Sequence, residues 1–156
     1  DTVYDAGKLV AKDVTITLPA INLLTADFKA MGTLTLPIIG QIEAMEATVN
    51  KVGTDMGLRS MASLDSRTLE FRWVQDVKKA DGSTKTVGCK AFLRVVTKTI
   101  PGLSVDPGSQ SENELGYAVS RYQLFVDGTE YWLIDQLNQI LRVGGKDYYK
   151  QIRSLL

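Results

Sequence analysis

The stretch Leu69–Val96 decides the fold, and it reads LEFRWVQDVKKADGSTKTVGCKAFLRVV. Its centre, Ala80–Ser83, contains the dipeptide Asp-Gly, a strong signal for a β-hairpin because both turn residues accept positive φ. Apolar and polar residues alternate on either side of that turn, which is the period of a half-buried strand. The apolar set is Leu69, Phe71 and Trp73 before the turn, and Cys89, Ala91, Leu93 and Val95 after it. The stretch therefore predicts two paired strands of about ten residues or more, longer than the usual five or six.

The same period of two continues outward from this hairpin. Val14–Leu18 alternates apolar residues with Thr and predicts a strand that ends at Pro19, which cannot donate to a ladder. Leu115–Val126 and Tyr131–Val143 predict two further strands, joined by a second Asp-Gly turn at Asp127–Gly128. Most of the chain is therefore expected to be antiparallel β-structure.

Two of the predicted strands have faces of particular interest. In Gln41–Lys51 neither side is wholly apolar: one side carries Glu43, Met45, Ala47 and Val49, and the other carries Ile42, Ala44, Glu46 and Thr48. Such a strand suits a sheet whose second face looks onto solvent or a channel. Within Leu115–Val126, strict alternation places Tyr117 and Val119 opposite Tyr122 and Leu124.

The remaining segments predict an arm, a loop and two helices. Lys29–Gly40 is interrupted by Gly and Pro and is interpreted as an irregular hairpin or extended arm, and Ile100–Asn113 as a loop. Asp55–Leu64, with Thr54 as a possible cap and Leu58, Met61 and Ala62 as an apolar stripe, predicts a short helix.

Gly144-Gly145 is expected to stop the sheet. Lys146–Leu156 then fits a terminal helix whose apolar stripe is Tyr148, Tyr149, Ile152, Leu155 and Leu156. The expected fold is mainly β, an antiparallel sandwich or barrel in a single domain over 1–156, with one short internal helix and a C-terminal helix.

Composition excludes several classes of function. The 156 residues include 18 Lys and Arg against 18 Asp and Glu, so the formal net charge is zero, which argues against nucleic acid as an electrostatic ligand. The absence of His removes His-based triads and His-ligated zinc. No apolar run approaches the roughly 20 residues that cross a bilayer. The first residues lack the order of a signal peptide, and the missing Met suggests a short leader before Asp1.

Candidate chemical sites are weak. Cys89 lies mid-strand with no His to activate it, and the carboxylate pairs Glu43/Glu46, Asp76/Asp81 and Glu112/Glu114 have solvated charge as their simplest interpretation. Trp73 and Trp132 could stack on a sugar, but their alternating apolar context favours the core. The sequence therefore predicts no catalytic, cofactor-binding or metal site, and no enzyme.

The long strands themselves favour self-assembly over catalysis. A sheet with long edges that nothing blunts risks uncontrolled pairing, whereas a protein that pairs with its own copies uses such edges.

Several stretches together resemble the major tail tube proteins of contractile-tailed phages. These are Val14–Ile21 (VTITLPAI), Ala44–Ala47 (AMEA), Tyr122–Glu130 (YQLFVDGTE) and the following Ile134-Asp135, Asn138, Ile140, Val143, Gly145 and Asp147. The last block is the most specific, because it is similar to the family's ending, in which a strand, an Asp-Gly turn and an Ile-Asp strand precede a basic helix. The likeness spans nearly the whole chain and departs most at about 53–68.

The resemblance implies a structural subunit of six-membered rings that stack into a hollow tube inside a contractile sheath. Each subunit would complete a hexameric inner β-barrel. The tube would belong to a virion tail or to a headless R-type bacteriocin, assembled in the bacterial host cytoplasm and driven through the target envelope. The implied partners are further copies, the sheath protein and a baseplate or tube initiator, with phage DNA or a tape-measure protein passing through the lumen without tight binding.

Within that framework, Glu43, Glu46 and Thr48 are predicted to face the lumen. The predicted contacts with adjacent rings come from the arm and the loop: Leu34, Leu36, Ile38, Ile39, Leu103 and Val105. The alternatives are a tube initiator or terminator of related fold, a carbohydrate-binding β-sandwich that exposes Trp73 or Trp132, and a hydrolase with clustered carboxylates.

Overall fold

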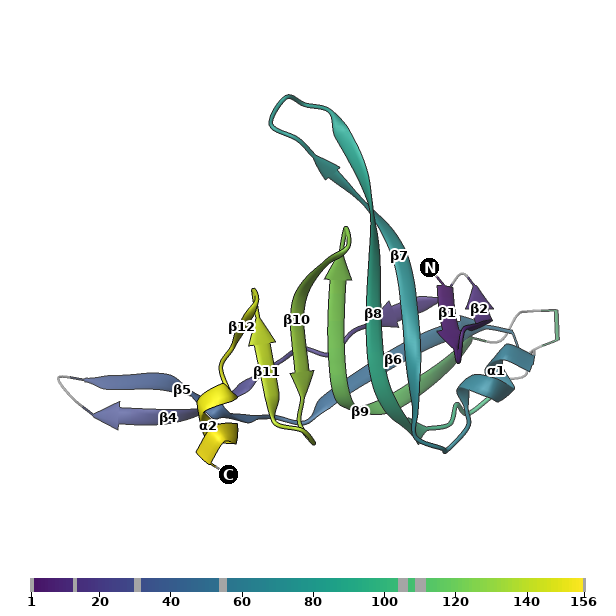
Figure 1. Cartoon of the computed structure of the whole chain (residues 1–156). Helices are drawn as coiled ribbons and strands as arrows, with labels where there is room; N and C mark the ends of the chain where they lie inside the picture. Colours follow the sequence, from purple (N-terminus) through teal and green to yellow (C-terminus); the bar gives the residue numbers. More distant parts are fainter. Residues whose placement is uncertain are drawn as a thin grey trace.

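The computed structural model describes residues 2–12, 14–29, 32–53, 56–103, 107–108 and 112–155. The chain is mainly β with antiparallel pairing, which confirms the expected fold class (Figure 1). The strands are β1 (Thr2–Asp5), β2 (Lys8–Lys12), β3 (Thr15–Thr17), β4 (Leu23–Lys29), β5 (Thr33–Ile42), β6 (Met45–Val52), β7 (Arg67–Lys78), β8 (Thr84–Thr99), β9 (Glu112–Val126), β10 (Thr129–Asp135), β11 (Ile140–Val143) and β12 (Lys146–Asp147). The helices are α1 (Met56–Met61) and α2 (Lys150–Leu155).

Strands β7, β8 and β9 form the spine of the main sheet. The order is β12-β11-β10-β9-β8-β7-β1-β2, with β6 paired to β9 and β3 paired to β6. In register, Leu69 lies opposite Leu93 and Phe71 opposite Ala91, and all four are fully buried. The alternation predicted around the Asp-Gly turn is confirmed, because one face of this hairpin is the core.

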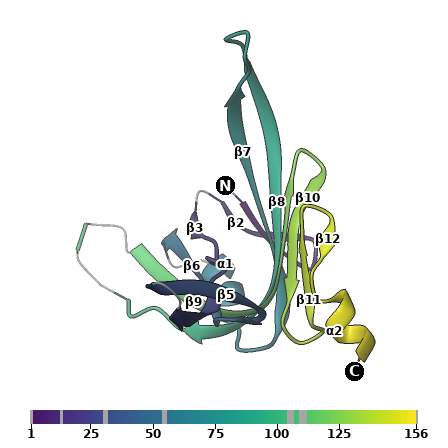
Figure 2. The ribbon, with the colours of Figure 1, turned by 90° about the vertical axis from the view of Figure 1, so that its left-hand side faces the viewer.

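The sheet divides along β9. Residues Glu112–Val119 of β9 pair with β6, and Arg121–Val126 pair with β10, while Ser120 belongs to neither ladder. Figure 2 shows the result: β10–β12 lie in one layer, and β6 with the first part of β9 lie in another, while α1 contacts β2 at the end of the sheet opposite β12 (Figure 1). Long strands that bend from one layer to the next are a recurrent way of closing a β-sandwich core.

The unpaired Ser120 is a β-bulge in β9, and it corrects the prediction for this strand. Tyr117 and Val119 were expected on the face opposite Tyr122 and Leu124, but all four are buried in one core. The unpaired Ser120 adds one residue to the alternation and returns Tyr122 to the inner face.

The two predicted Asp-Gly hairpins are confirmed, with different turns. Asp127 and Gly128 both have positive φ, 52° and 77°, as a two-residue type I′ turn requires. In the β7–β8 turn only Gly82 is left-handed, at φ 86°, and the Asp81 carboxylate accepts hydrogen bonds from the Ser83 amide (3.0 Å) and hydroxyl (2.6 Å). This is the three-residue hairpin in which glycine takes the left-handed position.

The single strand predicted over Tyr131–Val143 is wrong, because the chain turns at its middle. Asp135 ends β10 and its Oδ1 accepts hydrogen bonds from the amides of Leu137 and Asn138, both at 3.1 Å. This Asx turn reverses the chain, so β11 pairs back on β10.

The end of the chain also departs from expectation. Gly144 and Gly145 have φ of 61° and 84° and turn the chain into β12 instead of stopping the sheet. The helix α2 therefore starts at Lys150 and not at Lys146. The expected apolar stripe is not a packed face: Tyr149 is buried before the helix, Tyr148 is exposed and Leu155 is 82% exposed. The Ile152 side chain and Leu156 lie outside the described residues.

The predicted strand Gln41–Lys51 is interrupted. Ile42 ends β5 and Met45 begins β6, and the Glu43 amide donates to the Asn22 carbonyl at 2.8 Å. Glu43 therefore does not continue the inner face of β6, which is apolar at Met45, Ala47 and Val49.

The short internal helix is confirmed but is shorter than Asp55–Leu64. Its stripe packs on the core, with Met61 fully buried and Leu58 and Ala62 against the cluster. Leu64 lies beyond the helix and is 65% exposed, and the predicted cap, Thr54, with Asp55, lies outside the described residues. No helix in the described part of the chain has the length and apolar character needed to span a membrane.

Candidate assembly surfaces

The outer face of β6 and the first part of β9 is acidic and exposed to solvent, and we call it the acidic face. Because residues paired in register share a face, Glu46, Thr48 and Glu114 lie together, with Glu112 at the end of the strand. Glu46 is exposed and bonds Lys98 of β8. The face is hollowed by a cavity of about 500 Å³.

Two of the three predicted lumen residues therefore meet on one surface. Glu46 and Thr48 line the hollow of the acidic face, whereas Glu43 precedes β6 and is not among the residues that line it. Sequence reasoning treated Glu112 and Glu114 as unassigned solvated charges. The signal that could have placed them was their alternation with buried Asn113 and Leu115, which puts both carboxylates on the outer face.

A close backbone approach also shapes the acidic face. A Cβ atom at Gly116 would lie 2.9 Å from Thr99 Oγ1 and 3.0 Å from Thr99 Cβ. A larger residue at position 116 would therefore force Thr99 to move at the floor of the hollow.

The β4–β5 hairpin, which we call the arm, is the second candidate surface. It forms a two-stranded sheet of its own and extends away from the rest of the molecule (Figure 1). The expected arm is confirmed as a hairpin that begins earlier and is more regular than predicted. Leu34, Leu36 and Ile38 are 53%, 43% and 37% exposed. Leu103, the predicted loop contact, is 55% exposed, while the Ile39 side chain and Val105 lie outside the described residues.

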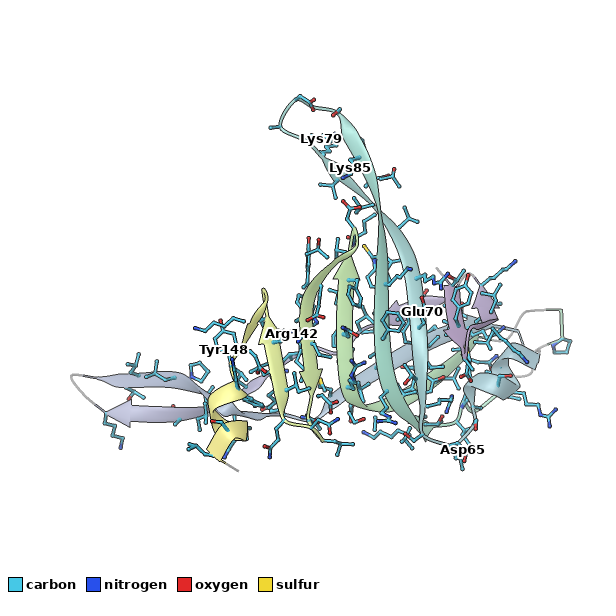
Figure 3. The ribbon with its side chains drawn as sticks, viewed as in Figure 1. Asp65, Glu70, Lys79, Lys85, Arg142 and Tyr148 are labelled. Carbon is cyan, nitrogen blue, oxygen red and sulfur yellow. The ribbon has the colours of Figure 1, made fainter. Side chains whose placement is uncertain are left out.

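The end of the β7–β8 hairpin is a second projection, which sequence reasoning missed. It rises well beyond the neighbouring strands, and Lys79 and Lys85 mark its end in Figure 3. Val74 and Val77 are 65% and 47% exposed. The available signal was length, because strands of 12 and 16 residues exceed what a sheet of ordinary strands can cover.

The outer face of β9–β11 carries an ordered polar network. The Arg142 guanidinium donates to both carboxylate oxygens of Glu130, at 2.6 and 3.1 Å, and Gln123 Nε2 donates to Glu130 Oε2 at 2.8 Å. The bond to Arg142 holds the pKa of Glu130 below its usual value. Glu70 and Arg142, labelled in Figure 3, both lie on the outward side of this sheet.

Residues 2–156 match the family described as "Phage tail tube protein FII", which covers all but the first residue of the chain. The chain belongs to this family. The resemblance noted in the sequence is thereby confirmed. No curated protein matches the sequence.

As a tail tube protein, the chain has a structural role, belongs to the tail of a virion, and assembles into a tube with other tail components. Its long β7–β9 spine and its projecting hairpins are the features that an assembling subunit needs, because they offer strand edges and exposed apolar side chains to neighbours.

Some of the residues considered for chemistry make structural contacts in this tail tube protein. Cys89 is buried, burial raises the pKa of its thiol, and its Sγ lies 3.6 Å from Gln75 Oε1. Asp76 accepts from the Thr86 hydroxyl at 2.8 Å across the hairpin. Among the described residues, no group of three or more Asp, Glu, Cys or His is placed to hold a metal ion.

The two tryptophans pack against the core, as the sequence favoured. Trp73 and Trp132 both contact the buried cluster, and the Trp132 ring meets Tyr122 edge-on at 5.9 Å between centroids. The Trp132 ring also lies 6.3 Å from the ring of Tyr131, which is 45% exposed.

Proposed function

We propose that this chain is the repeating subunit of the inner tube of a contractile tail or a tail-derived bacteriocin. Residues 1–156 act as one tail tube domain, and six copies form each ring. The rings stack around a central channel inside a sheath, and contraction drives the tube through the target envelope. The protein performs no catalysis, and it is made and assembled in the cytoplasm of the bacterial host.

The observation that carries this proposal is the unpartnered arm. An isolated two-stranded hairpin is marginally stable in water, and this one exposes Leu34, Leu36 and Ile38. A surface of this kind favours a state in which neighbouring copies cover it. Leu34, Leu36, Ile38, Ile39, Leu103 and Val105 are the proposed contacts with adjacent rings.

The acidic face supports the proposal for the lumen. A polyanion such as DNA meets carboxylates at Glu46, Glu112 and Glu114, so it passes without being retained by phosphate contacts. Glu46 and Thr48 are the proposed lumen residues, together with Glu43 in the β5–β6 connection. A tape-measure protein fills the same channel before DNA, and the outer surface meets the sheath and, at one end, the baseplate initiator.

Electron microscopy of purified protein at raised concentration tests the assembly. Long uniform tubes are the expected result. Single rings that never stack would assign the chain to an initiator or terminator role, and a persistent monomer would overturn the proposal.

Selective labelling tests the lumen placement. In a Cys89→Ala background, we expect Glu46→Cys tubes to react with a small maleimide but not with a maleimide attached to a large globular protein. The matched control is Arg94→Cys, exposed on the outer side of β8, which should react with both reagents. Equal reaction of Glu46→Cys with the large reagent would place this residue outside the channel.

A further inference from the structure

A largely apolar groove lies on the outer face of β7, β8 and β9, and its charged lining residues are Arg72 and Lys90. Its cavity is about 720 Å³, a size typical of sites that bury several apolar groups. Phe92 and Phe125 form one wall, edge to face at 5.9 Å between ring centroids and 89° between planes. Val74 forms the other wall, 65% exposed, and lies opposite Gly88 in register.

Gly88 makes the floor of this groove. It lies on β8 two residues from Lys90 and four from Phe92, so all three positions share the outer face. A Cβ atom at Gly88 would meet nothing within 4 Å. The floor is therefore open to a side chain that approaches from outside.

The arm is a projecting hairpin with an apolar face, so it is complementary to the groove in both shape and polarity. Leu34, Leu36 and Ile38 alternate along β5, so they lie on one face of the hairpin, with Thr33 and Thr35 on the other. Asp27 and Lys29 are the charged side chains of the described arm residues, so few charges would be desolvated when the arm is buried.

We propose that the apolar face of the arm of one copy occupies the Phe92–Phe125 groove of a neighbouring copy. This inference rests on the proposed function, because it requires identical subunits in contact. Within one chain the arm extends away from β7 and β8 (Figure 1), so the arm cannot reach the groove of its own subunit.

The pairing of two different surfaces has a consequence for assembly. A contact of this kind is heterologous, since each subunit gives an arm to one neighbour and receives an arm from another, and it can close a ring or extend a stack. Burial of apolar area against apolar area drives the association without a specific charge pair. The groove is a better acceptor than the acidic face, because Arg72 in its lining keeps its partner Glu70 at 2.6 Å, whereas Glu112 and Glu114 would lose water without gaining partners.

Two complementary variants test the inference. Leu36→Asp places a charge on the apolar face of the arm, with Thr33→Asp on the opposite face, beside Lys29, as its control. Gly88→Phe fills the groove in a strand that favours aromatic residues, with Gly88→Ala as its control. We expect each of the two blocking variants to fold normally by circular dichroism and to lose tube formation at least tenfold, and each control to assemble.

Mixing the variants gives the decisive result. Leu36→Asp keeps an intact groove and Gly88→Phe keeps an intact arm, so an equal mixture should form a 1:1 dimer with a single junction that cannot extend. Analytical ultracentrifugation measures that mass. Absence of any dimer in the mixture would overturn the inference, and so would normal tubes from Gly88→Phe, which would leave the groove to another partner such as a sheath segment.

Disulfide trapping keeps the inference falsifiable if a variant fails to fold. With Cys89→Ala, the pair Leu36→Cys and Val74→Cys should link successive subunits covalently on oxidation, while Thr33→Cys with Val74→Cys should not. Equal linking of both pairs would contradict the predicted face of the arm. Failure of the proposed function is distinct: wild-type protein would then form no tubes, yet the mixed dimer and the selective disulfide would still be observed.

Discussion

Tyr117 shows how one buried side chain joins the two layers of the subunit. It lies on β9, is 1% exposed, and its hydroxyl donates to the carbonyl of Met61 at the end of α1, at 2.8 Å. The Arg67 guanidinium donates to the same carbonyl and to that of Ser63, and its centre lies 5.8 Å from the Tyr117 ring. These contacts satisfy carbonyls at the helix end, which has no intrahelical partners for them.

We predict that Tyr117→Phe lowers the free energy of unfolding by about 0.5–1.5 kcal/mol, the net value of a typical hydrogen bond. The ring stays in place and Arg67 still donates to Met61, so the loss stays at this level. Urea denaturation of the monomer measures the change. Tyr148→Phe is the control, since Tyr148 is exposed and should show no effect.

The same residue predicts a loss of stability in alkali. Burial raises the pKa of Tyr117 to about 12, above its unfolded value of about 10. The unfolded chain therefore loses this proton first, so stability is intact below pH 10 and falls as the pH rises from 10 to 12. One such group contributes a slope of at most about 1.4 kcal/mol per pH unit.

Tyr117→Phe should reduce that slope between pH 10 and 12 without abolishing it, because burial also raises the pKa of Tyr122 and of Tyr149. Urea midpoints collected across this range give the measurement. An unchanged slope in the variant would mean that Tyr117 ionises freely in the folded protein.

At the scale of the element, alternation predicted the strands but not their interruptions. The β7–β8 hairpin and the β9–β10 turn follow from the sequence, because an apolar period of two and an Asp-Gly dipeptide are both local. The bulge at Ser120 is not encoded locally. It depends on where, along β9, pairing with β6 ends and pairing with β10 begins. One extra residue then reversed the faces expected for Tyr122 and Leu124.

The turn after Asp135 was missed for a different reason. Leu137 made the segment look continuous, yet its side chain is 74% exposed at the tip of the turn. The signal was present in Asp135 and Asn138, residues that favour turns because their side chains bond nearby backbone. It was outweighed by the surrounding Leu and Ile.

Asp135→Ala is predicted to destabilise the fold by about 1–3 kcal/mol, because it leaves two amides of the turn without their acceptor. Asp135 is 4% exposed, and it also accepts from Asn138 Nδ2 at 2.8 Å and lies 3.8 Å from Arg121 Nε. Asp135→Asn is the matched variant, since it keeps an oxygen for the turn amides and should lose less. Thermal denaturation ranks the three proteins, and equal loss in both variants would assign the effect to the charge instead of the turn.

In the whole molecule the formal net charge is zero, but two outer faces differ in their local charge. The acidic face carries Glu46, Glu112 and Glu114 against Lys98, whereas the outer face of β7–β11 balances Glu70 and Glu130 with Arg72 and Arg142. The sequence could indicate Glu46 and Thr48 together because they alternate on one strand. It could not indicate the Phe92–Phe125 groove, because that wall exists only once β8 and β9 pair in register.

Amide hydrogen exchange tests the proposed difference between the free and the assembled subunit. In the monomer we expect rapid exchange of the amides of the arm, Leu23–Lys29 and Thr33–Ile42. The arm is a two-stranded sheet with an exposed apolar face. Few hydrogen bonds hold its base, such as that from Gln136 Nε2 to the Ile42 carbonyl at 3.4 Å. In tubes the same amides should become protected by at least tenfold, because a neighbouring copy covers them. Gly116–Val119 of β9 provides the internal control, since it is paired on both sides within one chain and should be protected in both states. Equal protection of the arm before and after assembly would show that it completes no neighbour, and the arm would then have to be stabilised within its own subunit.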